Sequence, residues 1–107
     1  MNNVYYRQVE RDDKIVVEDI HTVVVHRFSV GDTEDPDVYA GYPIYLWQQS
    51  EAGKFVMNHA IEPPLWVKNV NHMTWGFDYV IQAKLLGKHL TEFLLRFGDT
   101  IEASRTN

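Results

Sequence analysis

A run of alternating apolar and polar residues narrows the choice of fold more than any other feature of this sequence. Between Phe77 and Leu85 every second side chain is apolar or aromatic, and Asp78, Gln82 and Lys84 lie between them. Successive side chains of a β-strand point to opposite faces of the sheet, so one face of this run is apolar. The run therefore predicts a strand that buries one face against a core.

Other runs of β-branched and aromatic residues predict short strands along the chain. They cover residues 4–9, 14–20, 21–30, 42–48 and 54–59. Arg11-Asp12-Asp13 predicts a turn, and the polar residues 31–37 predict a surface loop. Residues 49–53 end in Gly53 and predict a hairpin turn, with a positive φ at this glycine. Pro63 and Pro64 mark the end of a strand, because proline cannot donate to a sheet.

The segment after the Phe77–Leu85 run has two interpretations. Residues 86–90 predict a turn, and residues 91–97 predict a returning strand with Phe93, Leu95 and Phe97 on one face. The apolar residues at 86, 90, 93, 94 and 97 also fit one face of a helix. We expect the strand, and the helix is the alternative.

About six short strands at close spacing predict an all-β fold. The 107 residues amount to one domain, predicted to span 1–107, and 14 aromatic residues supply bulk for its core. Short antiparallel strands of this kind close into small barrels or sandwiches. A small, strongly bent antiparallel β-barrel fits this length best.

Composition and spacing exclude several kinds of chemistry. The chain has no cysteine, and its five histidines lack the spacing of a zinc site. The acidic segment 32–37 lacks the pattern of a calcium-binding EF-hand loop. Ser29, Ser50 and Ser104 lie in no nucleophile elbow, and the glycines form no phosphate-binding loop. We expect no enzymatic activity, no cofactor and no metal. A hydrolase with a metal site at residues 32–37 is a further alternative, and its activity would be lost on chelation.

Net charge and hydropathy limit the kinds of partner that this protein is expected to bind. The formal net charge of −5 argues against a general basic coat for duplex DNA, although residues 53–98 carry five Lys and Arg against three acids. No apolar run reaches the ~18 residues of a membrane span, and Met1-Asn2-Asn3 opens no signal peptide. We therefore expect a cytoplasmic protein without a membrane partner.

The segment between Trp66 and Trp75 is the first candidate for nucleic-acid binding. It carries Lys68, Asn69, Asn71 and His72 between the two indoles. Aromatic rings stack on unpaired bases, and amide, imidazole and ammonium groups bind base edges and phosphates. These four residues and Trp75 are the predicted contacts. Alternatively, the tryptophans pack in a core or an interface.

Residues 94–101 resemble the second signature motif of Sm and Sm-like proteins. An aliphatic pair precedes Arg96, then Phe97 and Gly98, and a short apolar closing segment follows. The resemblance implies a strongly bent barrel whose terminal strands pair with neighbouring subunits in a ring. It also implies that Arg96 lines an RNA site in the pore of that ring.

A second resemblance covers more of the chain. Residues 26–57 are similar to a family of small proteins from ocean metagenomes and marine cyanophages. The shared positions include Glu34-Asp35-Pro36, Pro43-Ile44, Trp47 and the segment 53–57, and the blocks 77–79 and 91–93 follow the same pattern. The resemblance implies an Sm-like barrel, a ring of about five to seven subunits, and a role in nucleic-acid processing within an infected bacterial cell.

Two functions are therefore expected from the sequence. The first is binding of single-stranded RNA, or single-stranded DNA, by a cyclic homo-oligomer that takes part in RNA or DNA processing. The alternative is a small phage structural or assembly protein that binds other proteins through its strand edges, which exposed aromatic residues and an acidic surface also fit. Salt-dependent affinity for an oligonucleotide distinguishes the two.

Overall fold

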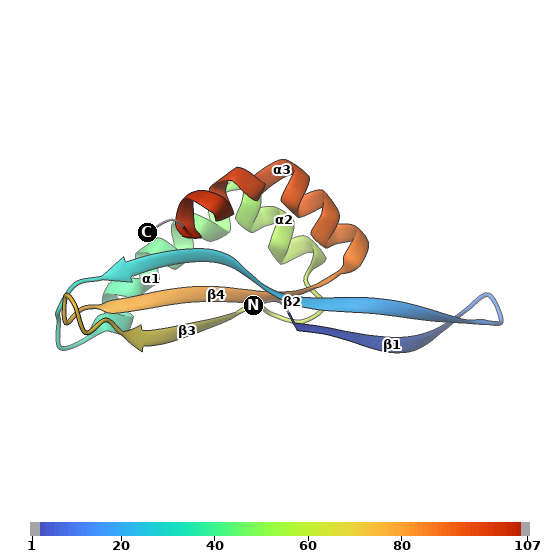
Figure 1. Ribbon diagram of the computed structural model, residues 1–107, viewed down its shortest axis with the longest axis horizontal. Coiled ribbons are helices and arrows are strands. Elements are labelled where there is room, and N and C mark those ends of the chain that lie inside the picture. Colours follow the sequence, from blue (N-terminus) through green and yellow to red (C-terminus); the bar gives the residue numbers. More distant parts are fainter. Residues whose placement is uncertain (1–2, 106–107) are drawn as a thin grey trace.

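The strand predicted from the alternating run lies at the centre of an antiparallel sheet. A computed structural model describes residues 3–105, in which four strands and three helices form (Figure 1). The elements are β1 (Asn3–Arg11), β2 (Lys14–Val30), α1 (Pro36–Gln49), α2 (Glu51–His59), β3 (Leu65–Val70), β4 (Phe77–Leu86) and α3 (Gly87–Arg105). The predicted domain 1–107 includes residues 1–2 and 106–107, which lie outside the described residues.

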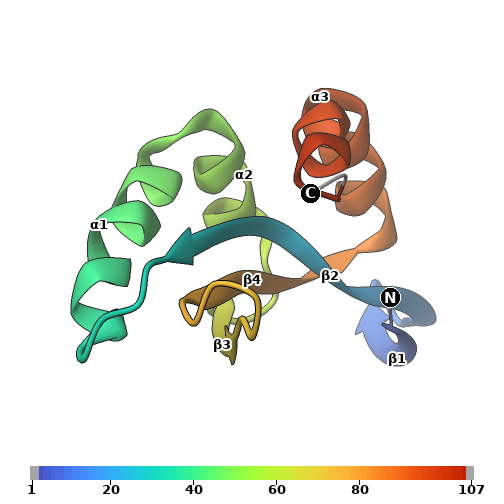
Figure 2. The ribbon, with the colours of Figure 1, turned by 60° about the vertical axis from the view of Figure 1, so that its left-hand side comes forward.

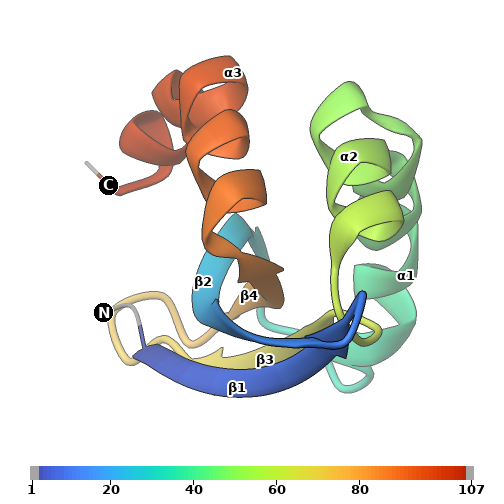
Figure 3. The same ribbon diagram turned by 90° about the vertical axis from the view of Figure 1, so that its right-hand side faces the viewer.

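The sheet has the strand order β1-β2-β4-β3, and each neighbouring pair is antiparallel. It curls into a half-barrel (Figure 3). Within β2 the register shifts between Val24 and His26, which marks a β-bulge. Such a bulge increases the local twist and bends the strand. The predicted antiparallel, strongly bent sheet is confirmed at this level.

Strand β2 is long enough to pair with two strands in succession. Its first part pairs with β1, and from Ile20 onward it pairs with β4, where Ile20 lies opposite Leu86. Residues 6–19 therefore form a two-stranded ribbon that extends beyond the helices, which we call the β-arm (Figure 1). At its tip Asp12 and Asp13 have φ of 51° and 62°. Two central residues with positive φ are typical of a tight hairpin, so the predicted turn is confirmed.

All three helices cover the same face of the sheet (Figure 2). The core between them contains Val23, Val25, Trp47, Phe55, Val56, Ile81, Ala83, Leu85, Leu90 and Phe93. The apolar positions 79, 81, 83 and 85 of β4 are buried as the alternation predicts. Within residues 3–105 no helix is long and apolar enough to cross a membrane.

The predicted hairpin across residues 42–59 is wrong, because this segment forms α1 and α2. Ser50 separates the two helices and caps the second, its hydroxyl accepting a hydrogen bond from the Gly53 amide at 3.0 Å. Gly53 has no positive φ. A glycine is needed there because a Cβ would overlap the carbonyl oxygen of Trp47 and lie 2.6 Å from its carbonyl carbon.

The predicted strand at 91–97 is also wrong, and the alternative helix is observed as part of α3. Leu90 and Phe93 are buried on one side of α3, and Leu95 is exposed. In a strand Phe93 and Leu95 would share a face. In a helix Leu90 and Phe93 share one and Leu95 points away from it, which is the observed burial. The prediction of an all-β fold is therefore wrong, because the described residues also form three helices. The Sm-like segment 94–101 lies within this helix.

Burial of two histidines predicts a loss of stability on acidification. Burial lowers the pKa of His26 below its usual 6.5. Burial, followed by the charges of His59 and Lys88, lowers the pKa of His89 in the same direction. The unfolded chain then binds more protons than the folded protein just below pH 6.5, so the free energy of unfolding falls as the pH decreases from 7 to 5.

Urea denaturation at pH 7, 6 and 5 measures this dependence. We expect His26→Gln and His89→Gln to flatten it, whereas the control His72→Gln, at an exposed position of the β3–β4 turn, leaves it unchanged. An identical pH dependence in all four proteins would show that neither of these half-buried histidines is responsible.

Candidate functional site

Five of the six predicted nucleic-acid contacts come together at the β3–β4 turn. Lys68 and Asn69 lie on β3, while Asn71, His72 and Trp75 lie in the turn itself. His72 and Trp75 form an edge-to-face pair with ring centroids 5.7 Å apart. Trp75 has a positive φ of 59° and is largely exposed. One aromatic ring is thus available to a partner at this end of the sheet.

Two of the predicted polar contacts, Asn71 and Lys68, are engaged within the chain. The Asn71 side chain accepts hydrogen bonds from the amides of Met73 (2.9 Å) and Thr74 (3.3 Å) and donates one to Asp78 (3.1 Å). The Lys68 ammonium lies 3.3 Å from the Asp37 carboxylate. Asn71 therefore shapes the turn, and an acidic neighbour offsets the cation predicted for phosphate.

Asp37 links α1 to two strands of the sheet. The buried Tyr79 hydroxyl donates to its carboxylate at 2.6 Å. This hydrogen bond lowers the pKa of Asp37, and Lys68 lowers it further. Burial, together with the same carboxylate, raises the pKa of Tyr79 to about 12. Asp37 stays ionised and Tyr79 neutral over the physiological range, which keeps α1 on the sheet.

Arg96 is separated from the other five predicted contacts. It lies on α3, with its guanidinium 5.4 Å from the ring centroid of Phe55 and 5.1 Å from that of Phe97. It forms an ion pair with Glu92, at 3.4 Å on the same helix. Cations over aromatic rings at this distance are attracted to them. The observed contacts of Arg96 thus lie in the α2–α3 layer and away from the β3–β4 turn.

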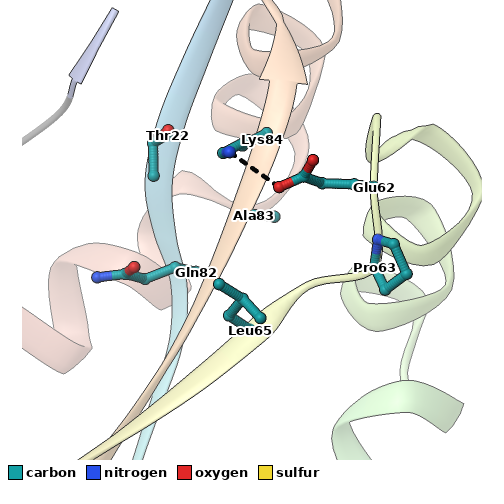
Figure 4. A pocket seen from close by; sticks show the side chains of 7 residues that line it. All are labelled: Thr22, Glu62, Pro63, Leu65, Gln82, Ala83 and Lys84. Carbon is teal, nitrogen blue, oxygen red and sulfur yellow. Dashed lines mark ion pairs between the residues drawn. The ribbon is translucent and has the colours of Figure 1, made fainter.

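Two hollows lined by described residues are too small for a typical ligand. One on the sheet holds about 50 Å³ and is lined by Thr22, Glu62, Pro63, Leu65, Gln82, Ala83 and Lys84, with a 2.8 Å ion pair between Lys84 and Glu62 (Figure 4). Another, of about 190 Å³, lies between α1, α2 and β3. Small-molecule sites usually enclose about 300–1,000 Å³. Among the described residues, no group of three or more His, Asp and Glu side chains is placed to hold a metal.

The β-arm presents apolar side chains to solvent on both of its faces. Ile15, Tyr6 and Val17 are 73%, 68% and 59% exposed. On the opposite face Val16 is 39% exposed, beside its cross-strand partner Val9. Single exposed apolar residues are common in proteins, but a cluster on a projecting element marks an interaction surface.

The two faces of the β-arm differ in charge. Cross-strand partners share a face, so Arg7, Arg11, Lys14 and Glu18 lie together with Val9 and Val16 on what we call the basic face. Glu18 is 8% exposed, and both arginines bind it, Arg7 at 3.0 Å and Arg11 at 2.6 Å. Three cations and one carboxylate leave two positive charges. The acidic face carries Glu10 and Asp19 beside Tyr6, Gln8, Ile15 and Val17.

Both outer strands of the sheet leave an edge open. In the described residues β1 pairs only with β2, and β3 pairs only with β4. Neither strand contains proline, and every residue of β3 is exposed. Open edges of this kind carry unpaired amide and carbonyl groups that accept a further strand.

The sequence did not predict β3 or the β-arm surface. The apolar runs at 4–9 and 14–20 indicated two strands, but nothing in them showed that β4 would pair only from Ile20 onward. The arm projects because β2 is longer than β4, which only the pairing reveals.

Comparisons of the chain with protein-family models, with curated proteins and with solved structures find no significant match. The resemblances to Sm-like and cyanophage proteins therefore stay predictions, as does the absence of enzymatic activity.

Proposed function

We propose that this protein is a structural or assembly protein whose copies bind one another through the β-arm and the open strand edges. The observation that carries the proposal is the exposure of apolar side chains on both faces of a ribbon that projects from the helix-covered body. They are Tyr6, Ile15 and Val17 on one face and Val16 on the other. Burying such side chains in an interface gains about 25 cal/mol per Å² of apolar surface removed from water.

The stability of the β-arm supports the same function. An isolated two-stranded ribbon is marginally stable in water, and residues 6–19 pair only with each other. The ion pairs of Glu18 with Arg7 and Arg11 stiffen the ribbon on one face. A partner that covers the arm would supply the packing that a third strand provides elsewhere in the sheet.

A contact between two different surfaces of one chain repeats from copy to copy. It closes into a ring when the rotation allows, and otherwise continues as a filament. The ring expected from the sequence is one outcome of this mode of association. Association of this kind forms a homo-oligomer and needs no nucleic acid.

Hydrogen–deuterium exchange at two protein concentrations tests this function. As association proceeds, peptides from residues 3–22 should gain protection at the higher concentration, whereas the central strand β4 should exchange equally at both. An arm that exchanges equally fast at both concentrations would contradict the proposal.

The same experiment with a single-stranded RNA oligonucleotide tests the first expectation from the sequence. Protection of residues 68–75 that weakens with salt would support nucleic-acid binding there. Unchanged exchange in this turn would contradict nucleic-acid binding there, and self-association would remain the proposed function.

A further inference from the structure

The outer side of α1 has the character of a buried surface. No charged residue occurs between Val38 and Gln49. Ala40 and Trp47 are buried against the rest of the protein, yet Val38 and Tyr42 on the opposite side are 74% and 67% exposed. A helix that is apolar on all sides is normally covered on all sides. We define the α1 outer face as Val38, Tyr39, Tyr42, Tyr45 and Leu46, all of which are exposed.

An acidic loop precedes this helix. Asp32, Glu34 and Asp35 are exposed, and they lie just before Pro36, the first residue of α1. A shallow hollow of about 390 Å³, lined by Ser29, Val30, Gly31, Asp32, Thr33 and Tyr39, connects the loop with the α1 outer face. An occupant of this surface needs an apolar stretch for the helix and cations for the loop.

The basic face of the β-arm supplies both. Val9 and Val16 are its apolar pair, and Arg11 and Lys14 lie next to them at the tip. The acidic face fits less well, because Glu10 and Asp19 would approach three carboxylates of the same sign. Like charges across an interface cost free energy and suppress the wrong arrangement.

Spacing along the two elements agrees with this match. From Asp35 to Tyr42 a helix rises about 10 Å. From Lys14 to Val16 a strand advances about 7 Å. The two distances differ by about 3 Å, so an arm that sets Lys14 against Asp35 brings Val16 between the levels of Tyr39 and Tyr42.

The arm and α1 of one chain lie far apart. The molecule measures 54 × 24 × 24 Å, and the β-arm and α1 occupy opposite halves of the long axis (Figure 1). A contact between them must join two molecules. We propose that the α1 outer face and the acidic loop bind the basic face of the β-arm from a second copy of this chain. This inference rests on the proposed function and names the surface that receives the arm.

Site-specific cross-linking tests the contact, because the chain contains no cysteine of its own. Val16→Cys protein is mixed with Tyr42→Cys protein and treated with a short bis-maleimide. Val17→Cys mixed with Tyr42→Cys is the matched control, since residues 16 and 17 are neighbours on opposite faces of the arm. We expect at least about tenfold more 16–42 than 17–42 product by peptide mass spectrometry.

Three results would overturn the inference. They are equal yields from both mixtures, a preference for the 17–42 product, and association of the chains without any link to residue 42. In these cases the proposed function stands with another receiving surface. A chain that stays monomeric and gives no linked product contradicts the proposed function itself.

A second variant guards against an effect of the cysteine on residue 42. Tyr42→Asp should weaken self-association at least tenfold while the thermal midpoint of the dilute protein stays unchanged. Asn58→Asp, at an exposed position of α2, is its control. Equal association of the two variants would contradict a role for the α1 outer face.

Discussion

Replacing Gly53 with alanine is expected to destabilise the protein by about 3 kcal/mol, the upper end for an overpacked core. The new Cβ would overlap the carbonyl of Trp47, and these backbone atoms form the junction of α1 and α2. Alanine stabilises a helix relative to glycine by about 1 kcal/mol. The steric overlap with Trp47 acts in the opposite direction and is the larger of the two effects. For a chain of this length, thermal denaturation should show a midpoint lowered by about 12–24 °C.

Gly41→Ala is the matched control for this substitution. Gly41 also lies within a helix, and its added Cβ would meet no atom within 4 Å. We expect it to stabilise the protein by about 0.5–1 kcal/mol. A Gly53→Ala protein as stable as the Gly41→Ala protein would contradict the packing of α2 against the end of α1.

Replacing Val16 with aspartate is expected to raise the dissociation constant of self-association by about 100-fold or more, because Val16 lies on the basic face of the β-arm. An apolar anchor at the centre of an interface contributes 2 kcal/mol or more, and a carboxylate buried there without a partner adds a desolvation cost. Val16 is 39% exposed in the single chain, so the stability of the dilute protein should change by no more than about 1 kcal/mol. Sedimentation velocity over a range of concentrations measures the association.

The control introduces the same charge away from the arm. Asn58→Asp adds one carboxylate to the exposed side of α2 and should associate like the original protein. If the two variants associate equally well, the basic face of the β-arm is not part of the interface.

The sheet could be predicted because its pattern is local. In β4 the alternation that separates Tyr79 and Ile81 from their polar neighbours is the pattern of a half-buried strand. The turn at Asp12 and Asp13 could also be predicted, because few residues other than glycine, asparagine and aspartate accept a positive φ. These features depend on neighbours within a few residues.

The helices could not be predicted from periodicity because α1 has none. Apolar residues surround it on every side, so a segment such as 42–48 resembles a buried strand. Two local signals were present and point to helices: Pro36 at the first turn of α1, and Ser50 three residues before the amide of Gly53 that it caps. For α3 the helical spacing of Leu90, Phe93 and Phe97 was visible as an alternative.

The candidate surface depended on pairing between distant segments. Tyr6 and Ile15 sit in sequences that predict ordinary half-buried strands. They are exposed because β4 pairs with β2 only from Ile20 onward, and no helix extends over the outer part of the β-arm (Figure 1). The same lack of periodicity that concealed α1 is the observation behind the proposal that a second copy covers its outer face.

The mass of the native protein at increasing concentration tests the central claim most directly. One chain has a mass of 12.5 kDa. Association through the β-arm predicts that sedimentation equilibrium gives integer multiples of this mass at micromolar concentration, with nucleic acid removed by nuclease. A mass of 12.5 kDa at every concentration would contradict the account.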